Sequence, residues 1–542
     1  MGLPGYFSFL VKNHPEIIKK LLKHSFQANN LFLDSNSIVY DAVHGTDFSK
    51  ITSNASSGAS SGASSVIIGK VIAKIEEYIL LINPDDTVYI GFDGVCPVAK
   101  LEQQRDRRYK SWYTAEIMKT IGTELGLKEK WDTTNITPGT VFMKELGEKI
   151  TQHFRNPAAY GVKKLVVSTS EEYQEAEHKI FKYIRDHPMD ADKKTIVYGL
   201  DGDLVMLSIN HLPICPNIYL FRETPHFIQS LDSSLEPNET YLLDIPELSR
   251  TILLNMNNGE EAESESGKTR VYDYIFLCFF FGNDFMKKFP ALNIRTGGVD
   301  KLLNAYKATL GGTADRMTDG KTIYWKNVRK VVKFLADREE QYIQDELKMR
   351  TRTEKRHYPM DTPEQVYTKF DALPTYERDM EKFINPFKAG WQSRYYKVLF
   401  NEVTGTVDAE QRKKEICQNY FESLEWTMKY YTEGCPDWRW RYKYHYPPLL
   451  SDLMEHMPYF ETSFIKDKPD NPVSQLVQLC YVLPRASLRL LPEALYNKLL
   501  AEHDDWYGTE YDFVWAFCKY FWESHVLLPE IEIEELERLV HG

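Results

Sequence analysis

The chain has 542 residues, 43% of them hydrophobic, which is enough to bury a large core in roughly two to four domains. Its net charge of −12 excludes a surface that is basic throughout, so any site for nucleic acid must be local. Seven cysteines without a CxxC pair argue against a disulfide scaffold or a structural zinc site, and no apolar run is long enough to span a bilayer. We therefore expect a cytoplasmic protein without a membrane segment.

Strand-like and helix-like segments alternate in the first part of the chain. Apolar residues at helical spacing predict helices over 66–81 and 175–187, and Thr137 before Pro138 predicts the capped start of a third helix. This alternation predicts an α/β fold with a mostly parallel sheet, in which ligands bind beyond the carboxyl ends of the strands. The predicted strands are LFLD (31–34), TVYIGFDG (87–94), KKLVVST (163–169) and TIVYGL (195–200).

The later part of the chain has a different character. The Ser/Gly/Ala-rich segment 51–65 and the acidic segment 255–268 are predicted to be surface loops, and 271–310 is predicted to be helical with a Gly-Gly turn at 297–298. From about residue 345 the sequence becomes helical, charged and rich in aromatic residues. We expect a core over 1–345, a connector over 346–375 and a second region over 376–542.

Seven carboxylates follow hydrophobic segments, where an unpaired charge is costly to bury. Each one has a structural explanation when taken singly, such as a turn residue, a helix cap or a favourable interaction with a helix dipole. Their joint occurrence at successive strand ends instead favours divalent-metal binding, by Mg²⁺ or Mn²⁺ and with two ions in an in-line displacement of a phosphodiester. The candidate metal-binding and catalytic residues are Asp34, Asp93, Glu175, Glu177, Asp201, Asp203 and Asp284.

A basic helix face follows Asp93 closely. Lys100, Gln104, Arg107 and Arg108 are spaced i, i+4, i+7 and i+8, so a helix would place them on one side. Guanidinium and ammonium groups bind phosphate through charge-assisted hydrogen bonds. The alternative is a solvated helix face, which is the usual explanation of a run of charges.

Three aromatic residues are candidates for stacking on nucleic-acid bases. Tyr40 follows Asp34 by less than two helical turns, and Trp438 and Trp440 lie in the segment WRWRYKYHYPP. Ordinary core packing is a strong alternative for both tryptophans.

Taken together, these segments resemble the XRN family of 5′→3′ exoribonucleases, in family order and across nearly the whole chain. The shared carboxylate motifs of flap endonucleases cover only the first half. The matching stretches are MGLPGYFSFL, LFLDSNSIVYD, FDGVCPVAKLEQQRDRRY, ITPGTVFM, EAEHKIFKYIR, YGLDGDLVMLSI, YIFLCFFFGNDF, GWQSRYYK, GCPDWRWRYKYHYPPLLSDL and SQLVQLCYVLPRASLRLLP.

The resemblance implies a PIN-like, flap-nuclease-like core whose mostly parallel sheet is flanked by helices, with a second, largely helical region packed on it and closing the site. It implies that the seven carboxylates bind Mg²⁺ and that Lys100, Gln104, Arg107 and Arg108 form a pocket for a 5′-monophosphate. The implied substrate is single-stranded RNA, removed one nucleotide at a time as nucleoside 5′-monophosphates. A capped or triphosphorylated end would be too bulky for the pocket.

The chain departs from the family pattern at several positions. Tyr173-Gln174 and Ala176 stand where the family usually has Pro-Gly before the first Glu and Gly between the two, and Tyr40 stands where the family commonly has His. The stacking tryptophan of the family corresponds best to Trp440, with Trp438 nearby. We expect a minimal catalytic core, without the long C-terminal domains of cytoplasmic members or the zinc knuckle of nuclear members.

The hypothesis from sequence is therefore a Mg²⁺-dependent, processive 5′→3′ exoribonuclease acting on decapped RNA, expected to be a monomer. A link to decapping factors stays open. Two alternatives remain: a flap-type structure-specific endonuclease, and a catalytically inactive RNA-binding scaffold that keeps the fold.

Overall fold

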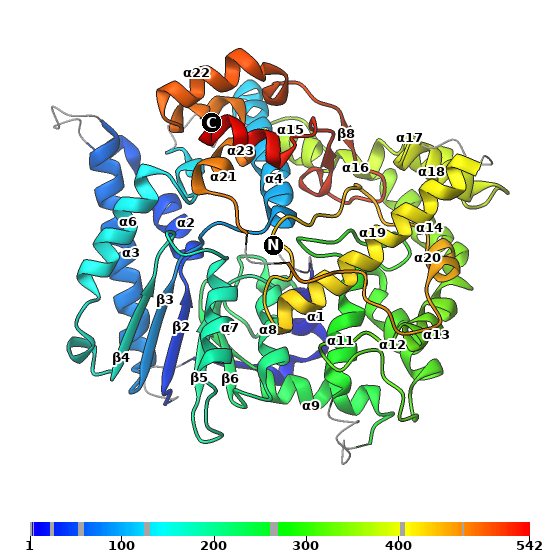
Figure 1. Cartoon of the computed structure of the whole chain (residues 1–542), viewed down its shortest axis with the longest axis horizontal. Helices are drawn as coiled ribbons and strands as arrows, with labels where there is room; N and C mark the ends of the chain where they lie inside the picture. The colour runs from blue at the N-terminus through cyan, green and yellow to red at the C-terminus, as the bar shows by residue number, and fades with distance from the viewer. Residues whose placement is uncertain are drawn as a thin grey trace.

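A computed structural model describes residues 3, 5–21, 27–51, 59–123, 131–260, 269–401, 407–468 and 471–542. A seven-stranded sheet with the order β1-β7-β6-β5-β2-β3-β4 lies in the N-terminal half of this part of the chain (Figure 1). Strands β2 to β6 run parallel, and β7 pairs antiparallel with β6 and with β1. The prediction of an α/β fold with a mostly parallel sheet is confirmed. The strands are β1 (Ile18–Lys20), β2 (Asn30–Asp34), β3 (Thr87–Gly91), β4 (Lys164–Ser168), β5 (Thr195–Tyr198), β6 (Ile218–Glu223) and β7 (Thr240–Asp244).

Helices cover both faces of the sheet because the central strands are apolar on both sides. In β2, Leu31 and Leu33 pack into one core cluster, and Phe32 between them packs into the other. Helices α3 and α6 lie on the first face, and α7 and α8 lie on the second (Figure 1). The helices of this half are α1 (Tyr6–Asn13), α2 (Asn36–His44), α3 (Ala59–Ile82), α4 (Val98–Ile121), α6 (Val141–His153), α7 (Ala176–Asp186), α8 (Asp203–His211) and α9 (Ile245–Met256).

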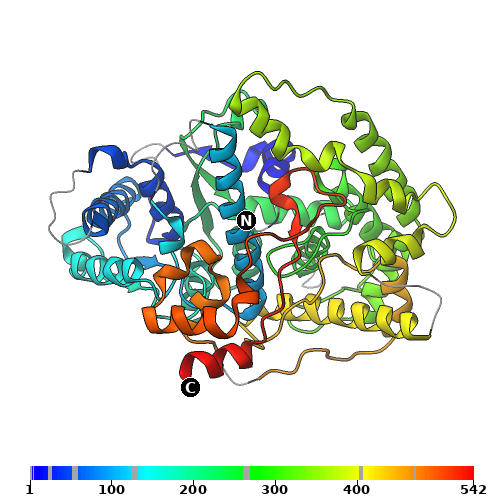
Figure 2. The same cartoon turned by 90° about the horizontal axis from the view of Figure 1, so that it is seen from above.

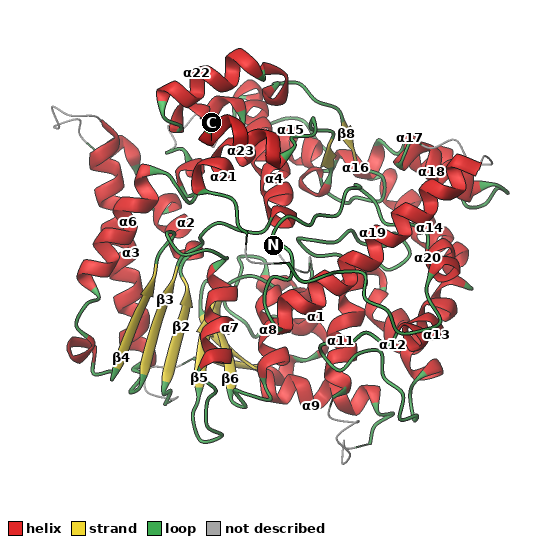
Figure 3. Ribbon diagram, in the orientation of Figure 1, coloured by secondary structure: helices red, strands yellow, loops and turns green. Residues whose placement is uncertain are grey.

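The C-terminal half is mainly helical, and its two short strands, β8 (Phe513–Val514) and β9 (His525–Val526), form a separate ribbon (Figure 3). Seen from above, the segment with α21 to α23 returns to pack beside α4 (Figure 2). The helices of this half are α11 (Arg270–Cys278), α12 (Gly298–Thr309), α13 (Trp325–Ala336), α14 (Glu339–Glu354), α15 (Pro363–Asp371), α16 (Leu373–Tyr376), α17 (Asp379–Ile384), α18 (Trp391–Leu399), α19 (Val407–Thr432), α20 (Leu450–His456), α21 (Gln475–Val482), α22 (Glu493–Glu502) and α23 (Ile533–His541).

The largest hydrophobic cluster joins the two halves. It contains Phe32 of the sheet, Phe285 of the loop after α11, and Trp426 and Tyr430 of α19. Helix α14 runs unbroken across residue 345. The division of the chain at that residue stays a prediction.

Three local predictions differ from the structure. Helix α3 begins at Ala59, inside the segment 51–65 predicted to be a loop, while residues 52–58 lie outside the described residues. Ala and Ser permit a helix, and the apolar stripe that continues through Ile67 and Val71 extends it. The cap of α6 is Thr140, whose side chain accepts from the Met143 backbone, rather than Thr137.

In the segment 271–310, helix α11 ends at Cys278, and α12 begins only at Gly298, after a 3₁₀ turn and a loop. Most of the acidic segment predicted to be a loop at 255–268 lies outside the described residues, and its first two residues end helix α9. Within the described residues, no helix is both long and apolar enough to cross a membrane.

Candidate active site

The strand order reverses between β2 and β5, which creates a switch point at the carboxyl edge of the sheet. The chain passes from β2 to β3 and β4 on one side, and β5 and β6 lie on the other. Such switch points are where parallel sheets bind ligands. Asp34 ends β2, Asp93 follows β3 by two residues and Asp201 follows β5 by three. The structure thus brings these three carboxylates to one edge, as their sequence positions predict.

Asp93 is held by two neighbours that orient its carboxylate. The Asn36 side-chain amide donates to Asp93 Oδ2 at 2.5 Å, and the Ala176 backbone N–H at the start of α7 donates to Asp93 Oδ1 at 2.8 Å. The Asp93 backbone N–H donates in turn to Asn36 Oδ1 at 3.1 Å. Asn36 therefore fixes Asp93 relative to Asp34, a role that the sequence analysis missed.

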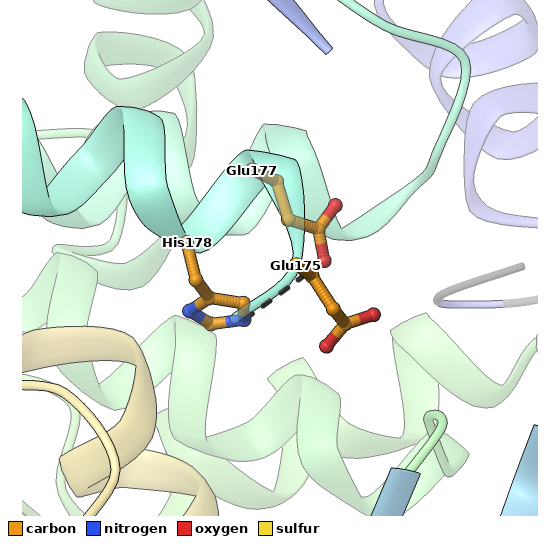
Figure 4. A group of neighbouring side chains, drawn as sticks. All are labelled: Glu175, Glu177 and His178. Carbon is orange, nitrogen blue, oxygen red and sulfur yellow. Dashed lines mark ion pairs between the residues drawn. The ribbon is translucent and has the colours of Figure 1, made fainter. Parts of the chain in front are cut away.

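Glu175 and Glu177 lie at the start of α7, where the helix dipole favours negative charge. Glu175 is the residue before the helix and Glu177 lies in its first turn. Figure 4 shows both carboxylates beside the ring of His178, and the ligand atoms of the three residues lie within 4.8 Å of one another. His178 stacks on Tyr430 of α19 with ring centroids 3.8 Å apart. Sequence reasoning did not single out His178 or Tyr430.

The loop before α7 packs tightly against the residue after Asp93. The Gly94 backbone N–H donates to the Gln174 carbonyl at 2.8 Å, and the Gln174 N–H donates to the Val95 carbonyl at 2.8 Å. A Cβ on Gly94 would lie 1.6 Å from the Glu172 carbonyl oxygen. Gln174 has φ +83°, a left-handed conformation that favours glycine. The backbone is therefore strained where the family pattern has Gly, yet Glu175 still reaches the site.

Lys100 lies among the carboxylates. Its Nζ pairs with Glu175 Oε1 and, at 2.5 Å, with Asp284 Oδ2. These side chains are 5–8% exposed, so the ammonium group compensates buried negative charge. Lys100 comes from α4, Glu175 precedes α7 and Asp284 follows α11, so this ion pair ties three elements together.

The pKa values show that one lysine does not compensate the whole cluster. Burial, and secondarily the charge of a neighbouring carboxylate, raises the pKa of Asp34, Glu177 and Asp203 well above the ordinary value. Burial also raises the pKa of Glu175, against the opposing effect of Lys100. For Asp284, burial acts to raise the pKa, but positive charges, chiefly Lys100 and with Arg107 among them, together lower it below the ordinary value.

This donor set fits divalent cations. Carboxylate oxygens are the ligands that Mg²⁺ and Mn²⁺ prefer. Asp203 Oδ1 and His178 Nε2 are buried without a hydrogen-bond partner among the described residues, which leaves ligand atoms available. The assignment of all seven carboxylates to metal stays a prediction: Asp34, Asp93, Glu175, Glu177 and Asp201 line one cavity, and Asp203 and Asp284 are not among its lining residues.

A cavity of about 430 Å³ brings carboxylates and the basic face of α4 together. Gln104 Oε1 and Arg108 Nε are buried in this region without a hydrogen-bond partner among the described residues. Burial lowers the pKa of Arg108. Arg105, off this face, instead donates to the carbonyls of Pro529 and Trp506. The lining includes Asp34, Asp93, Glu175, Glu177, Asp201, Tyr40, Lys100, Gln104, Arg107 and Arg108.

The three aromatic candidates are not brought together. Tyr40 lines the 430 Å³ cavity, and it also lines an adjoining cavity of about 1040 Å³ with Arg107, Arg108 and Trp112. Trp440 is 9% exposed and stacks on Trp426 with ring centroids 5.3 Å apart. Its indole N–H donates a hydrogen bond to the Glu422 carboxylate. Trp438 is 4% exposed and meets Tyr173 edge to face. Neither tryptophan is among the residues lining these two cavities.

Family models match most of the chain. Residues 1–224 match the model described as the XRN 5′-3′ exonuclease N-terminus, and residues 268–375 and 374–541 match the one described as the Xrn1 helical domain.

Curated relatives align over nearly all of the chain at low identity. They include 5′-3′ exoribonuclease 2 of Arabidopsis thaliana, 23% identical over 99% of this chain and 66% of the relative. 5′-3′ exoribonuclease 1 of Saccharomyces cerevisiae is 25% identical over 99% of this chain, which spans 43% of that relative. The 5′-3′ exoribonuclease 2 homolog of Drosophila melanogaster is 25% identical over 99% of this chain and 70% of the relative. The chain thus spans less than two thirds of the first two relatives.

Proposed function

The chain belongs to the XRN 5′-3′ exonuclease family, and from this premise we propose that it is a Mg²⁺-dependent, processive 5′→3′ exoribonuclease. Its proposed substrate is single-stranded RNA with a 5′-monophosphate, and its product is nucleoside 5′-monophosphate. We place this activity in the cytoplasm and assign it to a monomer. The observation that supports the proposal most directly is the 430 Å³ cavity, whose lining includes both the carboxylates and the basic face of α4.

The basic face selects the RNA end in this proposal. Arg107 and Arg108 bind the 5′-phosphate through charge-assisted hydrogen bonds, and Gln104 adds a neutral polar group. Tyr40 stacks on the first base at the mouth of the cavity. We propose that a cap or a triphosphate is too bulky for this phosphate-binding end of the cavity. The 5′-phosphate thus acts as a ruler that presents one phosphodiester at a time.

The carboxylate side performs the cleavage. The carboxylates would hold divalent cations, and that metal would supply an activated water and stabilise the leaving oxygen. Asn36 and the start of α7 orient Asp93, and Lys100 holds Glu175 and Asp284 in place. His178 of α7 stacks on Tyr430 of α19, which packs the helical region against the start of α7.

The test compares RNAs that differ only at the 5′ end. One 3′-labelled RNA is prepared with a 5′-monophosphate, a 5′-triphosphate or a 5′-hydroxyl, and each form is incubated with the protein and Mg²⁺. We expect fast loss of the monophosphate form alone, without intermediate ladders. Arg107→Met reduces this preference by roughly tenfold or more, whereas Lys144→Met, on the exposed face of α6, leaves it unchanged.

Equal cutting of the three RNAs would contradict the phosphate pocket and favour an endonuclease. No cutting with either Mg²⁺ or Mn²⁺ would favour a scaffold.

A further inference from the structure

A second cavity, of about 150 Å³, shares Arg107 with the 430 Å³ cavity and is also lined by Asp284. It forms where α4 meets the loop after α11, the segment before α20 and the segment around β9. Its lining includes Lys110, Lys287, Lys288, His445 and His525, together with Arg107. Of these residues only Arg107 also lines the 430 Å³ cavity, so the two cavities share one cation of α4.

The acidic residues of this lining are already paired with cations. Asp106 pairs with Lys110 at 2.7 Å, and Asp284 pairs with Lys100 at 2.5 Å. Glu523 pairs with two cations, Lys288 at 3.1 Å and Arg295 at 2.8 Å.

Two cations of the lining have no such partner. Neither Arg107 nor Lys287 forms an ion pair within 4 Å of any acid among the described residues, although both face the cavity. Burial lowers the pKa of Lys287, with Asp106 as the main opposing charge. The cavity therefore carries uncompensated positive charge, which a bound anion would offset.

Two histidines add neutral donors. The rings of His445 and His525 lie 5.8 Å apart, and neither ring nitrogen is hydrogen-bonded to another of the described residues. Burial lowers the pKa of His445 to about 4 and that of His525 well below the ordinary value, with Lys287 as a further cause in both cases. Each neutral ring keeps one N–H group that can donate to an oxyanion.

The size of the cavity limits the ligand. The cavity volume of about 150 Å³ is below the range of about 300–1,000 Å³ typical for drug-sized ligands. We propose that this cavity binds a phosphate-sized oxyanion, held by Lys287 and Arg107 with His445 and His525 as neutral donors. The proposal goes beyond the proposed function, with which it shares Arg107, and Lys287, His445 and His525 belong to this cavity alone. The ligand is either inorganic phosphate or the phosphate group of a nucleotide product.

Selenate provides a direct test because it has the size of phosphate and scatters anomalously. Crystals of the whole chain soaked in selenate are expected to show an anomalous peak within hydrogen-bond distance of Lys287 Nζ. Lys287→Met removes this peak, whereas Lys443→Met, an exposed lysine outside the lining, leaves it in place. A peak in the 430 Å³ cavity, if present, reports on the proposed active site and is unaffected by Lys287→Met.

Calorimetry supplies the second readout and separates the two sources. Lys287→Met is expected to weaken phosphate binding at this site about tenfold. Displacement of selenate by inorganic phosphate alone assigns free phosphate as the ligand, and displacement also by adenosine 5′-monophosphate assigns the phosphate group of the product. His525→Asn serves as the second variant if Lys287→Met does not fold. No selenate peak in this cavity, or a peak unchanged in both variants, would overturn the proposal.

Discussion

The ammonium group of Lys100 lies among carboxylates. It pairs with Glu175 and Asp284, and Lys100 lines the 430 Å³ cavity together with Asp34 and Asp93. Burial acts to lower the pKa of Lys100, but the neighbouring carboxylates outweigh it and raise the pKa. Lys100 is therefore charged in the folded protein and connects the metal-binding carboxylates to the phosphate-binding face of α4.

Lys100→Met removes this compensation and leaves several buried carboxylates facing one another. In metal-free buffer we expect the free energy of unfolding to fall by about 3–5 kcal/mol, the usual cost of breaking a buried ion pair. Addition of Mn²⁺ restores part of the loss because the divalent cation offsets the same charges. Urea denaturation with and without Mn²⁺ measures both effects, and Lys443→Met is the control. Equal stability of Lys100→Met and the parent protein without metal would contradict this role.

Some residues of the site follow from local sequence and others do not. Asp34, Asp93 and Asp201 are predictable because each lies at the end of a short apolar strand of a parallel sheet or within three residues after it. Tyr430 is not, since it lies on α19, far from Glu175 in the chain, and no local pattern places the two together. His178 belongs to a helix face that reads as ordinary packing, and the ion pair of Lys100 with the carboxylates depends on how α4 crosses the sheet edge.

At the scale of elements, α7 depends on the loop that leads into it. Gly94 lets residues 170–175 approach the end of β3, and this approach brings Glu175 beside Asp93. The positive φ of Gln174 shows that the loop is held there despite backbone strain.

Gly94→Ala tests this packing. The added Cβ meets the Glu172 carbonyl oxygen at 1.6 Å, so the loop must shift and move Glu175. We expect activity to fall by roughly 10²-fold, as for a displacement of about 1 Å in an active site. The matched control is Gly69→Ala on α3, where nothing lies within 4 Å, and there we expect a stability gain of about 0.5–1 kcal/mol with activity unchanged. Full activity of Gly94→Ala would show that the loop does not position Glu175.

A second link between elements is sensitive to pH. Glu339, the first residue of α14, accepts hydrogen bonds from the backbone N–H groups of Leu450 at 2.7 Å and Ser451 at 3.1 Å, where α20 begins. Burial raises the pKa of Glu339 to about 7, against these hydrogen bonds. A raised folded-state pKa means that the folded protein holds the proton more tightly. Protonated Glu339 therefore contributes its full stabilisation of the folded protein below the pKa of the unfolded chain. This stabilisation is lost as the pH rises to about 7.

Glu339→Gln removes this titration while keeping an oxygen acceptor. Between about pH 4.5 and pH 8 we expect the parent protein to lose about 3 kcal/mol more stability than the variant. Denaturant unfolding of both proteins across this range measures the difference, in which the other titrating groups cancel. Parallel stability curves would show that Glu339 keeps an ordinary pKa.

For the whole molecule, the main question is whether the helical region is needed to form the site. The ring of Phe285, next to Asp284, packs against the rings of Trp426 and Tyr430, both on α19. The ring centroids are 5.1 Å and 5.3 Å apart. The alternation of strands and helices was sufficient to predict the sheet. The way the C-terminal region folds back onto α4 was not predictable from periodicity, because these contacts join residues hundreds of positions apart.

A fragment of residues 1–375 tests this dependence. Without α19 the apolar surface around Phe285 is exposed, so we expect the fragment to aggregate or to lack a cooperative melting transition. Co-expression with residues 376–542 is expected to restore a soluble, active complex. A soluble fragment with a cooperative transition of its own would instead support an independent core that ends near residue 345.

In the proposed mechanism, one cavity couples recognition of a 5′-phosphate to cleavage of the adjacent phosphodiester. The most direct measurement is the size of the first product released from RNA labelled with ³²P in its 5′-monophosphate, under single-turnover conditions with Mg²⁺. We expect all released label to be nucleoside 5′-monophosphate at the earliest times. Labelled oligonucleotides as the first products would contradict it, because the RNA would then be cut away from the phosphate pocket.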